Sequence, residues 1–160
     1  MRFLVSRDVR LNPQLRLILT AYLMGLFVFL LFSFHSEMTK FGLLPSQISD
    51  TVLGNKDQFR EPLSLENLIN ESHIRLFLYS LSTLTAFSIL AVTEMNLLPQ
   101  MILALGSMVF VLTDSASLFA IRYLGENFSI LKAIAFFGMQ GSLIFVTAYA
   151  LKFLAKDPIA

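Results

Sequence analysis

The chain has 160 residues, of which 56% are hydrophobic and only 14% charged. Soluble domains carry about 25% charged residues, so this composition excludes a disordered chain, a basic nucleic-acid-binding domain and a disulfide-stapled secreted module. Cysteine is absent, which excludes disulfides and thiolate metal ligands, and a net charge of +1 identifies no partner.

Four stretches are long and apolar enough to cross a bilayer, which takes about 20 residues. They lie at about 15–34, 73–92, 97–123 and 129–154. Helices are expected because hydrocarbon offers no partner to a backbone N–H or C=O. Short connections make the successive helices antiparallel neighbours. The sequence therefore predicts one all-α integral membrane domain over residues 1–160, an up-down-up-down bundle of four transmembrane helices.

The first connection, residues 35–72, is long and carries six acidic and three basic residues. Ser46 and Gly54 predict the start and end of a short helix within it, and Ser64 predicts the start of a second, interfacial helix. Apolar residues of this second segment repeat at helical spacing, at Leu65, Leu68 and Ile69.

Basic residues near the ends of the spans predict the orientation of the chain. The N-terminal segment carries Arg2, Arg7, Arg10 and Arg16, and the C-terminal tail carries Lys152 and Lys156. The connection 35–72 is acidic. We therefore expect a protein of the bacterial cytoplasmic membrane, with both termini in the cytoplasm and residues 35–72 outside.

Residues 42–77 carry three short motifs in a fixed order: Leu-Gly-Asn-Lys-Asp at 53–57, Pro-Leu-Ser-Leu at 62–65 and Ser-His-Ile-Arg-Leu-Phe at 72–77. Over about residues 40–150 the chain resembles a family of small four-helix bacterial membrane proteins with a Thr-His-x-His-Leu-Phe-like motif at the start of the second helix. The resemblance implies the architecture rather than an activity. Arg75 stands where the motif has its second histidine, so a site that needs both histidines is absent.

Asp114 lies inside the third span, eight residues before Arg122 and so about 12 Å below its outer end. A charged carboxylate there costs at least ~2.5–3.5 kcal/mol, so it must be neutral or well partnered. Depth and side-chain tilt favour hydrogen bonds to Gln140 and Ser82, whereas Arg75 and Arg122 are expected at the outer interface. Asp114 is either a proton-relay or ion-site carboxylate, or a carboxyl that fixes helix register.

His35 ends the first span and His73 begins the second, at similar depth. A bis-histidine b-type haem needs imidazoles on two facing helices. The alternative interpretation is two interfacial histidines without a cofactor. We expect bound membrane lipid and no metal.

Three functions remain open. The small size and the lack of a complete catalytic set favour a non-catalytic accessory or assembly subunit of a larger bacterial membrane complex, such as a respiratory one, with lipids and membrane subunits as its partners. Its docking surface is predicted in the outer loop, at Glu61, Glu66, Glu71, Leu65, Leu68 and Ile69. The alternatives are a small electron-transfer protein that binds haem or quinone at His35 and His73, and an oligomeric proton-linked transporter or channel that uses Asp114.

Overall fold

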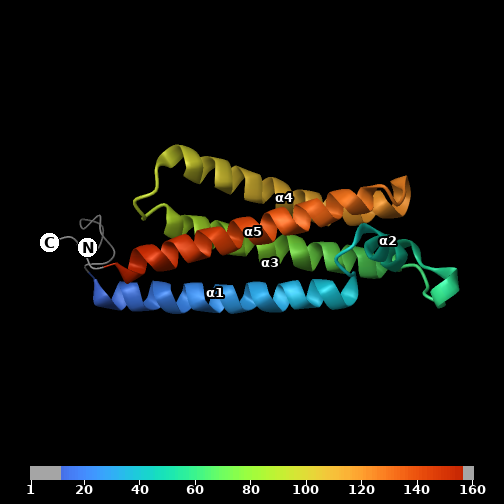
Figure 1. Cartoon of the computed structure of the whole chain (residues 1–160), viewed down its shortest axis with the longest axis horizontal. Helices are drawn as coiled ribbons and strands as arrows, with labels where there is room; N and C mark the ends of the chain where they lie inside the picture. Colours follow the sequence, from blue (N-terminus) through green and yellow to red (C-terminus); the bar gives the residue numbers. More distant parts are fainter. Residues whose placement is uncertain (1–11, 157–160) are drawn as a thin grey trace.

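The computed structural model describes residues 12–156 and consists of four long helices with short helices between the first two (Figure 1). Each long helix is long and apolar enough to cross a membrane. They are α1 (Pro13–Lys40), α3 (Leu65–Leu90), α4 (Leu97–Leu124) and α5 (Phe128–Ala155). Between α1 and α3 lie α2 (Pro45–Leu53) and the 3-10 helix η2 (Lys56–Gln58). The predicted fold class is confirmed: a four-helix transmembrane bundle. The connection that holds α2 and η2 is called here the outer connection, after its predicted side, and the end of the bundle that carries it is called the outer end.

Local sequence signals set the ends of these helices. The Asn12 side chain accepts hydrogen bonds from two backbone N–H groups of the first turn of α1, and Ser64 accepts one from Asn67 at the start of α3. These donors have no partner within the helix itself. Gly54 ends α2 and Gly125 ends α4, with φ angles of +85° and +115° that favour glycine.

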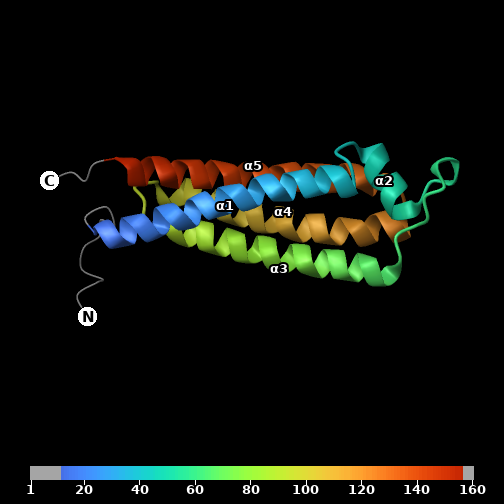
Figure 2. The same ribbon diagram turned by 90° about the horizontal axis from the view of Figure 1, so that it is seen from below.

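Long helices that follow each other along the chain run antiparallel (Figures 1 and 2). Helix α5 packs against α1, α2, α3 and α4, whereas α1 and α3 touch each other only lightly. Helix α4 lies close to α5 near its own C-terminal end and leans away from the rest of the bundle toward its first residues (Figure 1). Helix α3 packs mainly against α4, and α5 joins α1 to this pair.

Apolar side chains fill the bundle in three successive clusters. The central cluster includes Leu30, Phe136 and Leu143. A second cluster lies at the end of the bundle where α5 ends, and it includes Leu23, Ile89, Ala150, Phe153 and Leu154. The third cluster lies under α2, whose Ile48 and Val52 are almost completely buried. Burying such a side chain contributes about 1.5–3 kcal/mol, which holds α2 against α4 and α5.

The connection between the first two spans is shorter than the sequence predicted. It covers residues 41–64 rather than 35–72, because both flanking helices continue beyond their apolar runs. The second predicted short helix is wrong: residues 65–72 form the first turns of α3. The buried faces of α1 and α3 extend past the apolar runs to polar residues, Glu37 on α1 and Ser72 on α3. Because these side chains still pack inside the protein, residues 35–40 and 65–72 remain helical.

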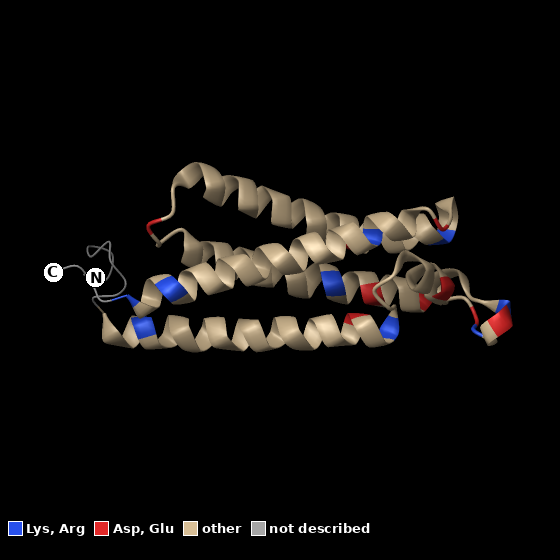
Figure 3. Cartoon of the chain, viewed as in Figure 1, with Lys and Arg blue, Asp and Glu red and all other residues tan. Residues whose placement is uncertain are grey.

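Charged side chains leave a broad uncharged band across the bundle (Figure 3). On α1 no Lys, Arg, Asp or Glu occurs from 17 to 36, and on α5 none occurs from 133 to 151. Twenty helical residues span about 30 Å, which is the thickness of the hydrocarbon core. The outer border of this band therefore lies close to Glu37 and Lys132.

Candidate functional site

Four charged side chains, one from each long helix, are buried together at the outer border of the uncharged band. Glu37 comes from α1, Arg75 from α3, Asp114 from α4 and Lys132 from α5, and their exposed fractions are 3%, 8%, 1% and 0%. We call these four residues the ion network. Buried charges are rare in proteins unless they are paired, so the network marks the strongest candidate site among the described residues.

Each carboxylate of the ion network contacts both cations. Lys132 Nζ lies 2.8 Å from Glu37 Oε1 and 2.9 Å from Asp114 Oδ1. The Arg75 guanidinium lies 2.5 Å from Glu37 Oε2, through Nη2, and 3.5 Å from Asp114 Oδ2, through Nη1. The four groups thus form a closed ring of alternating charge, with two negative and two positive members and no net charge.

Aromatic and polar neighbours complete the surroundings of the ring. The buried Phe41 ring centroid lies 4.8 Å from Arg75 Cζ and 5.1 Å from Lys132 Nζ, a geometry in which the ring face attracts both cations. Arg75 Nε lies 3.7 Å from the half-buried Glu71, which in turn pairs with Lys40 at 2.5 Å. The ion network therefore continues toward the protein surface through this pair.

A second group of polar side chains lies one turn farther into the membrane. Tyr79 and Ser33 are joined through their hydroxyl groups, and Gln140 Nε2 donates to Ser33 Oγ at 3.1 Å. The side-chain carbonyl oxygen of Gln140 is buried without a hydrogen-bond partner among the described residues. Helices α1, α3 and α5 are thus joined twice, once by ions and once by neutral groups.

A comparison with protein-family models matches residues 42–158 to the transmembrane helical domain Aq_1264_TM. The chain belongs to this family. The match includes Arg75, Asp114 and Lys132, whereas Glu37 precedes it. No curated protein and no solved structure matches the chain.

Membership of the Aq_1264_TM family confirms the predicted relationship to helical membrane proteins. The resemblance was placed at about residues 40–150, close to the matched range. The finer part of that expectation, a motif of the form Thr-His-x-His-Leu-Phe at the start of the second span, stays a prediction. In the structure the corresponding residues 72–77 form the third and fourth turns of α3.

The predicted partners of Asp114 are wrong. Asp114 is buried and partnered, but its partners are Lys132 and Arg75, while Gln140 binds Ser33 and Ser82 is only half-buried. The prediction relied on the tilt of the side chains along their helices. The side chains of Lys132 and Arg75 are long enough to reach Asp114 even though their Cα–Cβ bonds point elsewhere. In a medium of low dielectric, a cation also stabilises an ionised carboxylate far more than a hydroxyl or an amide does.

The predicted position of Arg75 at the outer interface is also wrong, since its guanidinium is turned into the bundle. Two buried carboxylates attract it more strongly than interfacial water does. Arg122, in contrast, is exposed three residues before Gly125, the residue that ends α4.

Sequence reasoning missed two members of the ion network. Glu37 is one of the six acids of the predicted connection 35–72, and Lys132 is not among the predicted site residues. A signal was present in the spacing. The buried positions of α1 are Leu23, Leu26, Leu30 and Glu37, separated by three, four and seven residues, which places them on one face of the helix. Lys132 continues the buried stripe of α5 in the same way.

The two histidines lie on exposed surfaces of different helices. His35 is exposed on α1, and His73 is exposed on α3 in a cleft that α3 forms with α4. The side of α3 that faces α1 carries Glu71, Arg75 and Tyr79 instead. Within residues 12–156 no group of three or more His, Cys, Asp or Glu side chains is placed to hold a metal ion.

Part of the predicted docking surface is not available to a partner. Leu68 is completely buried under α2, and Glu71 is held by Lys40 and Arg75. The remaining four residues are exposed, namely Leu65, Ile69, Glu61 and Glu66. Phe59 is a further candidate that the sequence did not indicate, and its side chain is 96% exposed in the middle of the connection between α2 and α3.

Proposed function

We propose that this chain is a non-catalytic accessory or assembly subunit of a larger bacterial membrane complex, and that it docks through Phe59 and the neighbouring exposed residues of the outer connection. The observation that carries the proposal is the position of Phe59. A phenylalanine side chain gains about 1.5–3 kcal/mol when it is removed from water, and aromatic residues are typical anchors of protein interfaces.

The loop that presents Phe59 is held by several hydrogen bonds. Asn55 and Arg60 form two backbone hydrogen bonds of 2.9 Å with each other, and the Arg60 side chain donates to Thr51 Oγ1 at 2.9 Å. Gly54 allows this tight packing, since a Cβ there would lie 2.9 Å from the Arg60 carbonyl oxygen. An anchor on a preorganised loop loses little conformational freedom on binding, which suits it to a docking role.

The ion network supports a structural role for the membrane part. Its charges cancel within the ring, and every charged group contacts two opposite charges. Such a ring ties four helices into one register, because shifting any helix would separate buried charges. This arrangement suits a subunit whose task is to present a surface rather than to turn over a substrate.

The proposal includes an orientation with the outer connection on the periplasmic side. Arg16 lies near the start of α1 and Lys152 lies in the last turn of α5. Both of these helix ends are at the end of the bundle opposite the connection (Figure 1). Short segments rich in Lys and Arg stay in the cytoplasm, so the start of α1 and the end of α5 are assigned to the cytoplasmic side.

The docking role is tested by purification in mild detergent from native membranes, followed by identification of the proteins that accompany the chain. We expect a defined partner with the wild-type protein and its loss with Phe59→Ser. Phe32→Ser is the matched control, because Phe32 is 70% exposed in the middle of α1. It should keep the partner, and both variants should unfold at the wild-type temperature.

Three outcomes contradict this proposal. The partner is retained by Phe59→Ser, the wild-type protein forms only a homo-oligomer, or the purified protein contains stoichiometric haem, which a visible spectrum would reveal. The last result would instead support an electron-transfer role for His35 and His73.

One observation favours a second candidate function, a proton-linked transporter. A cavity of about 270 Å³ opens between α1 and α3 and is lined by Glu37, Arg75 and Tyr79, so the ion network borders a space that a small ion can enter. Proton uptake into liposomes that contain the protein, lost in Glu37→Gln and unchanged in Phe59→Ser, would support this function over docking.

A further inference from the structure

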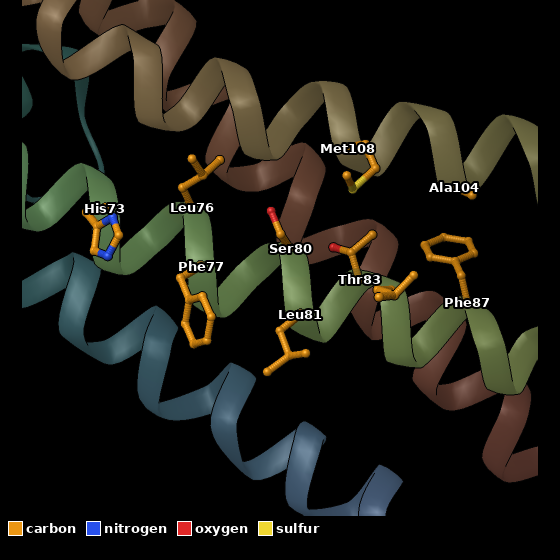
Figure 4. Close-up of a pocket in the computed structure, with 10 residues that line it drawn as sticks. His73, Leu76, Phe77, Ser80, Leu81, Thr83, Phe87, Ala104 and Met108 are labelled. Atoms are coloured by element: carbon orange, nitrogen blue, oxygen red, sulfur yellow. The ribbon is translucent and has the colours of Figure 1, made fainter.

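The seam between α3 and α4 contains an apolar cleft that faces the surrounding lipid. The cleft has a volume of about 580 Å³, and Leu76, Leu84, Phe87 and Met108 are among the side chains that line it. Figure 4 shows it along α3, with His73 at one end and Phe87 with Ala104 at the other. It exists because α4 leans away from α3 toward its first residues (Figure 1).

The length of the cleft matches one leaflet of a bilayer. From Leu76 to Phe87 the helix rises about 16 Å, which is close to half of the ~30 Å hydrocarbon core. An apolar cleft in this position excludes water and accepts a flexible hydrocarbon chain. Its length is thus suited to the chain of a lipid in the outer leaflet.

A polar hollow continues the cleft outward. It is lined by Glu66, Asn67, Asn70 and His73 together with two apolar residues, and His73 lines both spaces. The lining includes one acid and neither Lys nor Arg. A head group that enters the hollow therefore meets a negative side chain and amide groups, which favour an ammonium group over a net negative charge.

Hydroxyl groups lie between the hollow and the cleft. Ser72 and Ser115 line a further hollow of about 360 Å³. This hollow shares His73 with both the polar hollow and the cleft, and it shares Leu76 with the cleft. Ser115 is 8% exposed, and its hydroxyl has no hydrogen-bond partner among the described residues. An unpaired buried donor at this depth is placed to meet an ester carbonyl.

We propose that the α3–α4 seam binds one phospholipid whose head group carries an amine, phosphatidylethanolamine being the common example. The order of groups along α3 is the order of groups in that lipid. Glu66 receives the ammonium, Ser115 and His73 meet the oxygens of the phosphate and ester region, and an acyl chain occupies the cleft. This inference does not depend on the docking role of the outer connection.

The binding is tested with protein that has been delipidated in detergent and then supplied with phosphatidylethanolamine or phosphatidylglycerol, using native mass spectrometry as the readout. We expect one retained phosphatidylethanolamine and a preference for it over phosphatidylglycerol of about tenfold, the size expected of one charge-assisted hydrogen bond. Glu66→Gln should abolish the preference. Glu61→Gln, which alters an exposed acid outside the hollow, should preserve it.

A second pair of variants tests the cleft itself. Ala104→Phe fills the inner end of the cleft and should prevent retention of both lipids. Leu105→Phe places the same ring on the neighbouring, 65% exposed position and should have no effect. Equal retention of both lipids by the wild type, preferential retention of an isoprenoid quinone, or unchanged retention by a folded Ala104→Phe protein would each overturn the proposal.

Discussion

Of the two cations in the ion network, only Lys132 lies within 2.9 Å of both carboxylates. Lys132→Met keeps the length of the side chain and removes its charge. It leaves Glu37 and Asp114 with Arg75 as their remaining buried partner, and removing one member of a buried ion pair destabilises a protein by about 3–5 kcal/mol.

We therefore expect Lys132→Met to lower the free energy of unfolding in detergent by that amount, as measured by thermal unfolding. Lys152→Met is the control, because Lys152 is exposed near the end of the same helix and should change stability by less than about 0.5 kcal/mol. Equal effects of the two variants would show that the ion network contributes nothing to stability.

The effects of substitutions at Asp114 and Lys132 on the free energy of unfolding should not be additive. Asp114→Asn alone leaves an excess positive charge in the ring, whereas Asp114→Asn combined with Lys132→Met leaves the neutral pair of Glu37 and Arg75. The double variant should thus lose less stability than the sum of the single variants, by about 0.5–3 kcal/mol. A double-mutant cycle on unfolding free energies measures this coupling, and strict additivity would argue against the ring.

The sequence predicted that Asp114 is buried and needs a partner, because the apolar run around it is unmistakable. It did not predict the partner, since Glu37 and Lys132 stand at the borders of apolar runs, where charged residues usually face water. Only the packing of four helices decides whether such a border residue turns inward. Helical spacing indicates which face of a helix a residue lies on. It does not indicate how deeply that face is buried once the four helices have packed together.

At the scale of the helices, α4 and α5 approach each other closely at Gly138. A Cβ built there would lie 2.6 Å from the Phe110 ring of α4, so Gly138→Ala should overpack this contact and lower stability by about 1–3 kcal/mol. Gly141→Ala is the control on the same helix, because nothing lies within 4 Å of a Cβ at that position.

Gly141→Ala should instead raise stability slightly, by about 0.5–1 kcal/mol, since alanine favours a helix interior. Thermal unfolding of the two variants side by side distinguishes them. A Gly138→Ala protein as stable as the Gly141→Ala protein would show that Phe110 moves aside without loss.

The ends of the helices were predicted with uneven success. Ser64 and Gly54 act where the sequence placed them, because capping depends on a few neighbouring atoms. The lengths of α1 and α3 were underestimated because hydropathy measures contact with lipid. It does not detect a helical segment that is made of polar residues and packs against α2 and its neighbours instead of lipid.

For the whole molecule, the proposed orientation has a direct test. The chain contains no cysteine, so single cysteines label without background. Asp57→Cys in the outer connection should react with a membrane-impermeant thiol reagent in intact cells, whereas Asn96→Cys, exposed in the turn between α3 and α4, should react only after the cells are opened. The reverse pattern would place the outer connection in the cytoplasm.

The closed ring of charges also bears on how the protein is made. Helix α5 is synthesised after the other three, and until it inserts, the bundle holds two buried acids against the single buried base Arg75. A carboxylate without a cation is poorly tolerated in hydrocarbon, so a nascent chain interrupted before Lys132 cannot settle in the bilayer. The shared charges thus provide a check on biosynthesis that is satisfied only when all four helices are present.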